Sequence, residues 1–182
     1  KQKVGASKLF VDTDNSRIKK SIPDLYCDLS SIAKGFGVDK VGLLLERHNI
    51  ANYMVEIGGE VRTKGLNENK ENWRIGISTP LSNGLQKIIS LTNISVATSG
   101  DYLNYFEKNG VRYSHLIDIR TGRPIKHNLA SVSVLHANCG TADAIATAIN
   151  VMGPDLGYKF ALKKKLPIFM IVREGNEFIE KM

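Results

Sequence analysis

The chain has 182 residues, of which 42% are hydrophobic and 24% charged, a balance that excludes a disordered or low-complexity chain. Its formal net charge is +7, but the basic residues are dispersed and lack interleaved aromatic side chains. The charge therefore favours affinity for anionic ligands or surfaces, and its distribution is not typical of a nucleic-acid-binding protein. No apolar run is long enough to cross a bilayer, and the first residues contain neither a signal-peptide core nor a lipobox-like cysteine.

One long helix is predicted near the N-terminus, over residues 30–50. Hydrophobic residues recur there at helical spacing, and either Asp28 or Ser30 can serve as the N-cap. Gly35 and Gly37 interrupt the pattern, and each costs about 1 kcal/mol relative to alanine in a helix. Two such glycines predict that another part of the chain or a ligand approaches the helix backbone closely.

Strand-like runs outnumber helices in the rest of the chain, and hairpin-like turns join neighbouring runs. Gly58 and Gly59 join the two strands of one such hairpin. Helices are also predicted over residues 99–110, with Ser99 as N-cap, over 141–152 and over 155–165. Extended segments are predicted over residues 8–14, 21–30, 52–65, 72–79, 87–92, 94–100, 111–119, 129–136 and 167–179. The fold class is therefore α+β with mostly antiparallel sheet.

The segment GTADAIATAIN, residues 140–150, carries two oxygen-bearing side chains in a run that otherwise fits a buried helix. In a helix, Asp143 and Thr147 stand at positions i and i+4, so both project from one face. Two such oxygens can bind one hard cation such as Mg²⁺, with water, carbonyl or phosphate oxygens as the other ligands. The spacing alone equally fits a structural helix, because an acidic residue in the first turn favours the helix dipole.

Three other features are candidates for chemistry. An alternating strand over residues 111–119 places His115 on one face with Tyr113 and Ile117, and an imidazole can accept a hydroxyl proton near neutral pH. The glycine turns in EIGGE and ATSGDY are either plain hairpins or sites where backbone amides reach a phosphate or a planar ring. Cys27 and Cys139 match no metal-binding or redox spacing and are either reduced or joined in one disulfide.

Six motifs follow one another along the chain: DLSSIAKGFGVDK, EIGGEVRTKG, WRIGI, VATSGDY, RYSHLIDIRTGRP and TADAIATA. In this order they resemble the motifs of the FAD:protein FMN transferase family, the ApbE family, over nearly all of residues 25–175. The resemblance implies a T-fold-like α+β architecture with packed helices. It also implies FAD as substrate, Mg²⁺ as cofactor, and transfer of FMN to a Thr or Ser hydroxyl of a target flavoprotein with release of AMP.

The resemblance further implies a metal site. Its oxygen ligands would be the side chains of Asp143 and Thr147 and main-chain oxygens of Ser31 and Ala146. Ala146 can offer its carbonyl only where the helix departs from regular hydrogen bonding. The metal carboxylate is expected to be exposed, so that Asp143→Ala abolishes transfer and leaves the fold intact.

FAD-binding and catalytic roles follow from the same resemblance. FAD contacts are implied at Asp28, at Lys34 and at the backbone near Ile117. Lys34 pairs either with Asp28 or with phosphate, and the sequence leaves both open. The acceptor hydroxyl would attack the phosphorus on the riboflavin side of the pyrophosphate, and His115 would accept the proton of that hydroxyl.

Family members carry a sizeable N-terminal portion and an export signal, and residues 1–24 match neither. Residues 1–182 are therefore expected to form a single flavin transferase domain, either a C-terminal fragment or a minimal homologue. The resemblance implies a place in the cell envelope, at the periplasmic face or outer surface. Membrane attachment would come only from a lipid anchor that this chain lacks.

Two other functions remain open from the sequence. One is a Mg²⁺-dependent FAD pyrophosphatase, in which water replaces the acceptor hydroxyl and the products are FMN and AMP. The other is a non-catalytic flavin-binding module. Product analysis separates the first from a transferase, and FAD binding that ignores Mg²⁺ and releases no AMP would identify the second.

Overall fold

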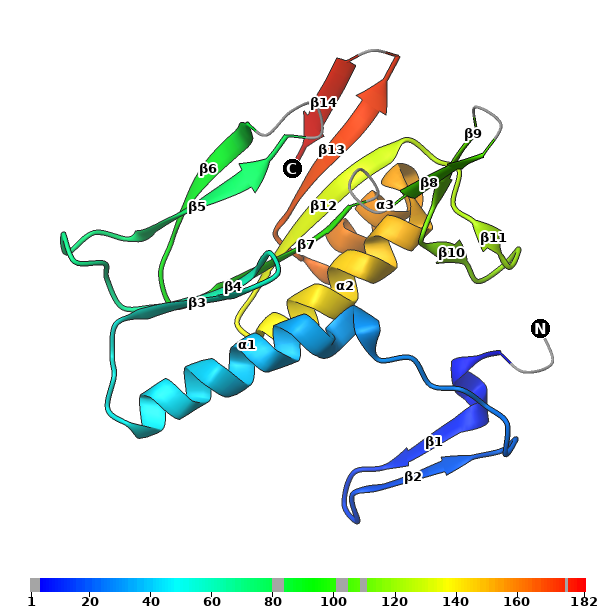
Figure 1. Ribbon diagram of the computed structural model, residues 1–182, viewed down its shortest axis with the longest axis horizontal. Helices are drawn as coiled ribbons and strands as arrows, with labels where there is room; N and C mark the ends of the chain where they lie inside the picture. The colour runs from blue at the N-terminus through cyan, green and yellow to red at the C-terminus, as the bar shows by residue number, and fades with distance from the viewer. Residues whose placement is uncertain (1–3, 80–83, 101–104, 109–110, 176) are drawn as a thin grey trace.

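A six-stranded sheet lies at the centre of the computed structural model, which describes residues 4–79, 84–100, 105–108, 111–175 and 177–182 (Figure 1). The strands, in spatial order, are β14 (Glu177–Lys181), β13 (Ile168–Glu174), β12 (Leu129–His136), β7 (Ser95–Gly100), β4 (Glu60–Lys64) and β3 (Tyr53–Ile57). All neighbouring strands are antiparallel. One face is covered by α1 (Ser30–Arg47), α2 (Cys139–Met152) and α3 (Pro154–Lys164). The predicted α+β class with mostly antiparallel sheet is confirmed.

The two faces of the sheet bury different sets of side chains, because successive residues of a strand point to opposite faces. In β13, Met170 belongs to the hydrophobic cluster that includes α2. The preceding residue, Phe169, packs instead in a cluster with Ile77. Ile77 lies in the hairpin of β5 (Trp73–Ser78) and β6 (Leu85–Leu91), which therefore packs on the face opposite the helices.

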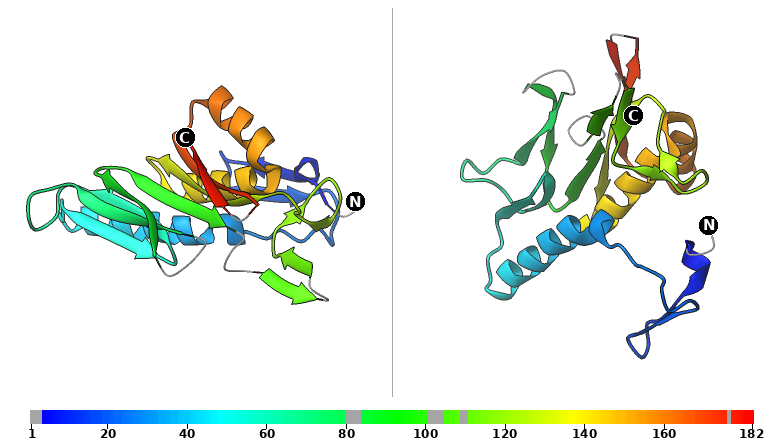
Figure 2. Two further views of the ribbon diagram at one scale, coloured as in Figure 1. Left: turned by 90° about the horizontal axis from the view of Figure 1, so that it is seen from above. Right: turned by 45° about the vertical axis from the view of Figure 1, so that its right-hand side comes forward.

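Three further pairs of short strands lie outside the central sheet. They are β1 (Leu9–Asp12) with β2 (Arg17–Lys20), β8 (Tyr105–Lys108) with β9 (Val111–Ser114), and β10 (Ile117–Asp118) with β11 (Arg123–Pro124); a 3₁₀ turn, η1 (Ala6–Lys8), precedes them. The β1–β2 hairpin stands apart from the sheet in Figure 1 and in the right-hand view of Figure 2. Its apolar side chains Phe10, Val11 and Ile18 are exposed.

Two sequence predictions for the middle of the chain are wrong. No helix spans residues 99–110: Ser99 lies in β7, residues 105–108 form β8, and the remainder, 101–104 and 109–110, lies outside the described residues. Cross-strand pairing of β8 with β9 overrides the local helical signal. The strand predicted over 111–119 breaks after Ser114, whose Oγ accepts a hydrogen bond from the Leu116 N–H at 3.1 Å.

The N-terminal region also departs from prediction in two details. Residues 21–29 form no strand. Leu29 occupies the N-cap position of α1 and makes no side-chain capping bond. The Asp28 carboxylate nevertheless accepts a hydrogen bond from the Ser30 N–H at 2.8 Å, which lowers the pKa of Asp28. Asp28 lies one residue before the observed N-cap, Leu29, and still satisfies a free N–H group of the first turn.

Both cysteines are free thiols, which settles the choice left open by the sequence. Cys27 is exposed and Cys139 is buried. Burial raises the pKa of the Cys139 thiol to about 12, and the nearby carboxylate of Asp39 adds to the shift. None of the helices in the described ranges is both long and apolar enough to cross a bilayer.

The backbone of α2 lies directly against α1 at Gly35. A Cβ atom at Gly35 would lie 2.5 Å from the Cys139 carbonyl oxygen and 2.8 Å from Gly140 Cα, both backbone atoms that cannot move aside. At Gly37 the nearest atom would be Ile57 Cδ1, the flexible end of a side chain, at 3.3 Å. The predicted close approach to the helix backbone is therefore confirmed at Gly35.

Gly35→Ala is expected to lower the free energy of unfolding by about 2 kcal/mol or more, because the two helices must separate to fit the methyl group. Gly37→Ala is the matched control. It gains helix propensity and should change the stability by less than about 1 kcal/mol. Urea denaturation of both variants measures the difference, and equal stabilities would contradict the assigned contact.

Candidate functional site

A cavity of about 420 Å³ opens where the N-terminal turns of α1 meet α2, the end of β7 and the segment that follows β9. We call it the α1–α2 cavity. It brings together six of the residues singled out from the sequence: Ser31, Lys34, His115, Ile117, Asp143 and Thr147. Two others, Asp28 and Ala146, do not line it. A larger cavity of about 570 Å³ lies between the β10–β11 hairpin and the start of α3, and none of these eight residues lines it.

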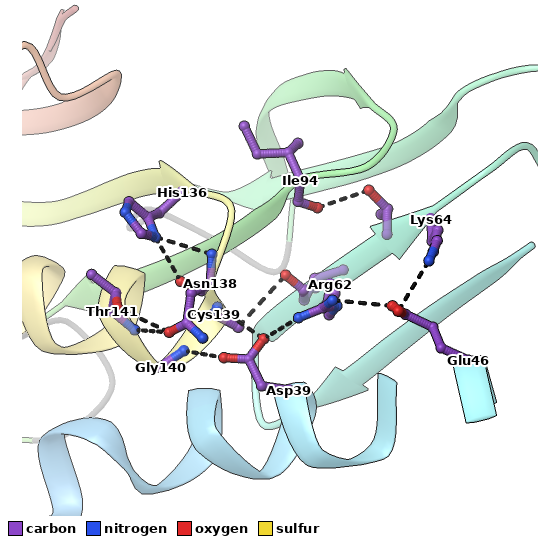
Figure 3. A network of polar contacts seen from close by, with 12 residues as sticks. Asp39, Glu46, Arg62, Lys64, Ile94, His136, Asn138, Cys139, Gly140 and Thr141 are labelled. Atoms are coloured by element: carbon purple, nitrogen blue, oxygen red, sulfur yellow. Dashed lines mark hydrogen bonds and ion pairs between the residues drawn. The ribbon is translucent and has the colours of Figure 1, made fainter. Parts of the chain in front are cut away.

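Asp39 of α1 holds the start of α2, which forms one wall of this cavity. The buried Asp39 carboxylate accepts hydrogen bonds from the Cys139 N–H at 3.1 Å and from the Gly140 N–H at 2.9 Å (Figure 3). These are among the N–H groups that have no partner inside the helix. Asn138, the N-cap residue, accepts a third bond from the Thr141 N–H at 2.8 Å. The start of α2 is therefore capped both locally and from α1.

Arg62 of β4 compensates the buried charge of Asp39. Its guanidinium is 2.6 Å from Asp39 Oδ1 and 3.1 Å from Glu46 Oε1 (Figure 3). Glu46 also accepts a hydrogen bond from Tyr53 Oη at 2.6 Å and pairs with Lys64 at 3.0 Å. This polar network ties α1, β3, β4 and α2 together, so the cavity wall is held by charged hydrogen bonds as well as by apolar packing.

Asp143 lies one turn into α2 and is buried, with 5% of its surface exposed. Its Oδ2 accepts a hydrogen bond from the Gly35 N–H at 3.0 Å, and no hydrogen bond to Oδ1 comes from the described part of the chain. Burial raises the pKa of Asp143, and the Gly35 N–H and the charge of Lys34 oppose that shift. The expectation of an exposed carboxylate is wrong, because the close contact of α1 with α2 covers it.

The arrangement of Asp143 and Thr147 fits a cation. Both side chains lie in α2 four residues apart and line the same cavity, and Thr147 is half-buried. A buried carboxylate is costly without a compensating charge, and a hard cation supplies one. Among the described residues no cluster of three or more His, Cys, Asp or Glu side chains could hold a metal. A cation at Asp143 would therefore need hydroxyl and main-chain oxygens in addition.

The two predicted main-chain ligands differ in their surroundings. Ser31 lines the cavity in the first turn of α1. Ala146 is 1% exposed and packs in the main hydrophobic cluster, and α2 continues unbroken for six residues beyond it. Both carbonyls lie inside helices, but only Ser31 lines the cavity, so the geometry favours Ser31 over Ala146 as a source of an oxygen ligand.

His115 reaches the cavity from the connection between β9 and β10, and Ile117 from the start of β10, so the two do not share one face of a single strand as expected. His115 follows directly after the end of β9, and its side chain is exposed. Ile117 pairs with Pro124 in the short β10–β11 ladder. The break in the strand after Ser114 therefore brings an imidazole to the edge of the cavity.

Glu60 is a buried carboxylate that also lines the cavity, and no motif in the sequence pointed to it. Glu60 Oε2 is 2.7 Å from Lys34 Nζ, an ion pair without the angles of a directed hydrogen bond. Burial raises the pKa of Glu60, and Lys34 opposes the shift. Lys34 thus pairs with Glu60, whereas the sequence had offered Asp28 or phosphate as its partner. No local spacing could reveal a pair that joins residues 26 positions apart.

Comparisons with known proteins agree with the fold and the residue pattern. A model described as the ApbE family matches residues 1–170. The FAD:protein FMN transferase of Haemophilus influenzae is 46% identical over 183 residues, which cover 98% of this chain and 53% of that protein. The corresponding protein of Vibrio cholerae is 50% identical over 169 residues, 92% of this chain and 51% of its own length.

Solved structures show the same architecture. The flavin transferase ApbE from Vibrio cholerae superposes with a TM-score of 0.88 at 45% identity, over 99% of this chain and 57% of that one. The ApbE protein from Thermotoga maritima superposes with a TM-score of 0.85 at 32% identity, over 98% and 58%. The chain thus spans about half the length of the relatives that it matches.

Asp39→Asn should lower the free energy of unfolding by about 3 kcal/mol, because it removes the charge partner of Arg62 and one acceptor for the N-terminus of α2. Lys64→Gln is the control. It breaks a more exposed pair of the same network and should cost less than about 1 kcal/mol. Similar urea midpoints for the two variants would argue against Asp39 as the main tie between α1 and α2.

The same network predicts a pH dependence at Glu46. The Tyr53 hydroxyl, followed by Lys64 and Arg62, lowers the pKa of Glu46 from 4.5 to about 2. A lowered carboxyl pKa stabilises the fold above the unfolded value, and this contribution is lost as the pH falls through about 2. The stability difference between wild type and Glu46→Gln should therefore be largest at neutral pH and shrink on acidification. A difference that stays constant with pH would exclude this role of the charge.

Proposed function

The chain belongs to the ApbE family, and we propose that it transfers FMN from FAD to a Thr or Ser hydroxyl of an acceptor flavoprotein, with Mg²⁺ as cofactor and AMP as the second product. The observation that carries this proposal is the α1–α2 cavity itself. One wall holds a buried carboxylate beside a hydroxyl, and the same cavity is lined by a lysine and a histidine. Such a set suits a pyrophosphate substrate, which needs charge neutralisation and a proton acceptor.

Asp143 and Thr147 would hold the cation, with a main-chain oxygen from Ser31 and, less favourably, Ala146. When bound, Mg²⁺ neutralises charge on the pyrophosphate of FAD. Asp143 suits this task because its Oδ2 is fixed by the Gly35 N–H, which leaves Oδ1 for a ligand. The side chain therefore needs little reorganisation on binding.

Lys34 would bind a phosphate of FAD through its ammonium group, and the backbone near Ile117 would also contact FAD. Asp28 does not line the cavity, so any contact that it makes with FAD would lie just before the first residue of α1. Its carboxylate already accepts the Ser30 N–H, which supports an indirect part in ordering the first turn.

His115 would accept the proton of the acceptor hydroxyl. The hydroxyl oxygen forms a bond to the phosphorus on the riboflavin side, and the anhydride bond to the AMP phosphate breaks. AMP leaves with the bridging oxygen and its electron pair. The product is an FMN phosphoester on the acceptor protein, so atoms and charge balance without an oxidant or reductant.

The acceptor is proposed to present its hydroxyl in a short exposed motif, because His115 lies at the exposed edge of the cavity. By its resemblance to exported family members, the protein is proposed to work in the cell envelope. Cell fractionation with detection of the chain would locate it, and recovery only in the cytoplasmic fraction would oppose that location.

Asp143→Asn is expected to reduce transfer about 100-fold or more, because the neutral amide is a poor ligand for Mg²⁺. Stability in the absence of Mg²⁺ should be unchanged or higher, since an amide costs less to bury than a carboxylate. Transfer is measured as flavin fluorescence that stays with the acceptor band in a denaturing gel, with FAD and Mg²⁺ supplied.

Asp155→Asn, the same substitution in the first turn of α3, serves as control and should leave transfer unchanged. A wild-type rate of FMN transfer in the Asp143→Asn variant would contradict the assignment of Asp143 as a metal ligand. Free FMN without labelled acceptor would instead identify a pyrophosphatase, and FAD binding without AMP release would identify a binding module.

A further inference from the structure

The glycine turn between β3 and β4 does not serve as a cradle of free amides, which was one reading of its sequence. The Gly59 N–H already donates to Glu56 Oε1 at 2.6 Å. Gly58 turns its carbonyl oxygen to Lys34, whose Nζ donates to it at 3.1 Å. The turn therefore binds the Lys34 ammonium group through the carbonyl oxygen of Gly58.

The backbone conformation of Gly58 and its lack of a side chain leave room for Lys34. Its φ of 58° lies in the left-handed region, and a Cβ atom there would approach Lys34 Cδ to 3.1 Å. A side chain at this position would therefore press on the stem of Lys34. The absence of a side chain at Gly58 allows the turn to lie directly over the lysine.

Glu60, two residues further on, holds the same ammonium from a buried position. It is 1% exposed, and the Oε2–Nζ distance is 2.7 Å. Its Oε2 receives no directed hydrogen bond from the described residues, so the charge of Lys34 is its main compensation. Lys34 in turn has 46% of its side chain exposed and lines the α1–α2 cavity.

We propose that Glu60 is a positioning residue, which together with the Gly58 carbonyl fixes the Lys34 ammonium at the wall of the α1–α2 cavity for an anionic ligand. A free lysine side chain has many rotamers, and binding a phosphate would require it to lose them. The buried carboxylate selects one arrangement before the ligand arrives. This inference rests on the proposed function for the nature of the ligand, a phosphate of FAD, but not for the positioning itself.

The positioning can be measured without any ligand, through the reactivity of the Lys34 amine. Competitive acetylation followed by peptide mass spectrometry compares Lys34 with Lys159, an exposed lysine of α3. In Glu60→Gln the relative labelling of Lys34 should rise about two- to fivefold, the range for losing a partly exposed ion pair. Glu56→Gln, a matched control in the same turn, should leave it unchanged.

Coupling to ligand binding is tested with a double-mutant cycle. The affinity for FAD with Mg²⁺ is measured by calorimetry for wild type, Glu60→Gln, Lys34→Met and the double variant. If Glu60 acts through Lys34, Glu60→Gln weakens binding about fivefold in the wild-type background and less than about twofold in the Lys34→Met background. Equal losses in both backgrounds, or unchanged Lys34 labelling, would overturn the proposal.

Two further results keep the test decisive. If Glu60→Gln fails to fold, Glu60→Asp retains the charge on a shorter side chain, and Lys34 labelling above the wild-type level is then expected. Labelling at the wild-type level would count against the proposal. If wild type does not bind FAD, the proposed function fails, while the labelling result still decides whether Glu60 positions Lys34.

Discussion

The structure depends on one contact, the close approach of α1 and α2 at Gly35 and Asp39. Gly35 has no side chain, so the backbone of α2 can lie against it, and Asp39 one turn later receives two N–H groups from the start of α2. Arg62 neutralises the resulting buried charge and links both helices to the sheet. The apolar residues of α2 pack on the sheet, and this contact sets how its first turn meets α1.

The chemistry of the cavity is a consequence of that contact. The Gly35 N–H that faces α2 is also the donor that fixes Asp143, so one glycine serves both packing and site geometry. Lys34 is the residue next to it in sequence and carries the opposing charge. Lys34 of α1 and Asp143 of α2 therefore line one cavity because the backbones of the two helices are in contact at Gly35.

Much of this could be predicted from local sequence signals. Hydrophobic periodicity and glycine turns located the long helices, the β3–β4 hairpin and the closing hairpin, and the i, i+4 spacing put Asp143 and Thr147 on one face. The break after Ser114 and the strand at 105–108 depend on pairing between segments, which a local pattern does not contain. Glu60 was missed for the same reason, since its partner lies in another element.

The contrast between the two cysteines has a practical consequence for spectroscopy. Cys27 is exposed three residues before α1, whereas Cys139 is buried with a pKa raised to about 12. Because the thiolate is the reactive form, a maleimide dye would attach almost entirely at Cys27. Residues 1–182 therefore offer one preferred attachment point, three residues before the helix whose first turn lines the cavity. A fluorophore there could report flavin by energy transfer without any engineered residue.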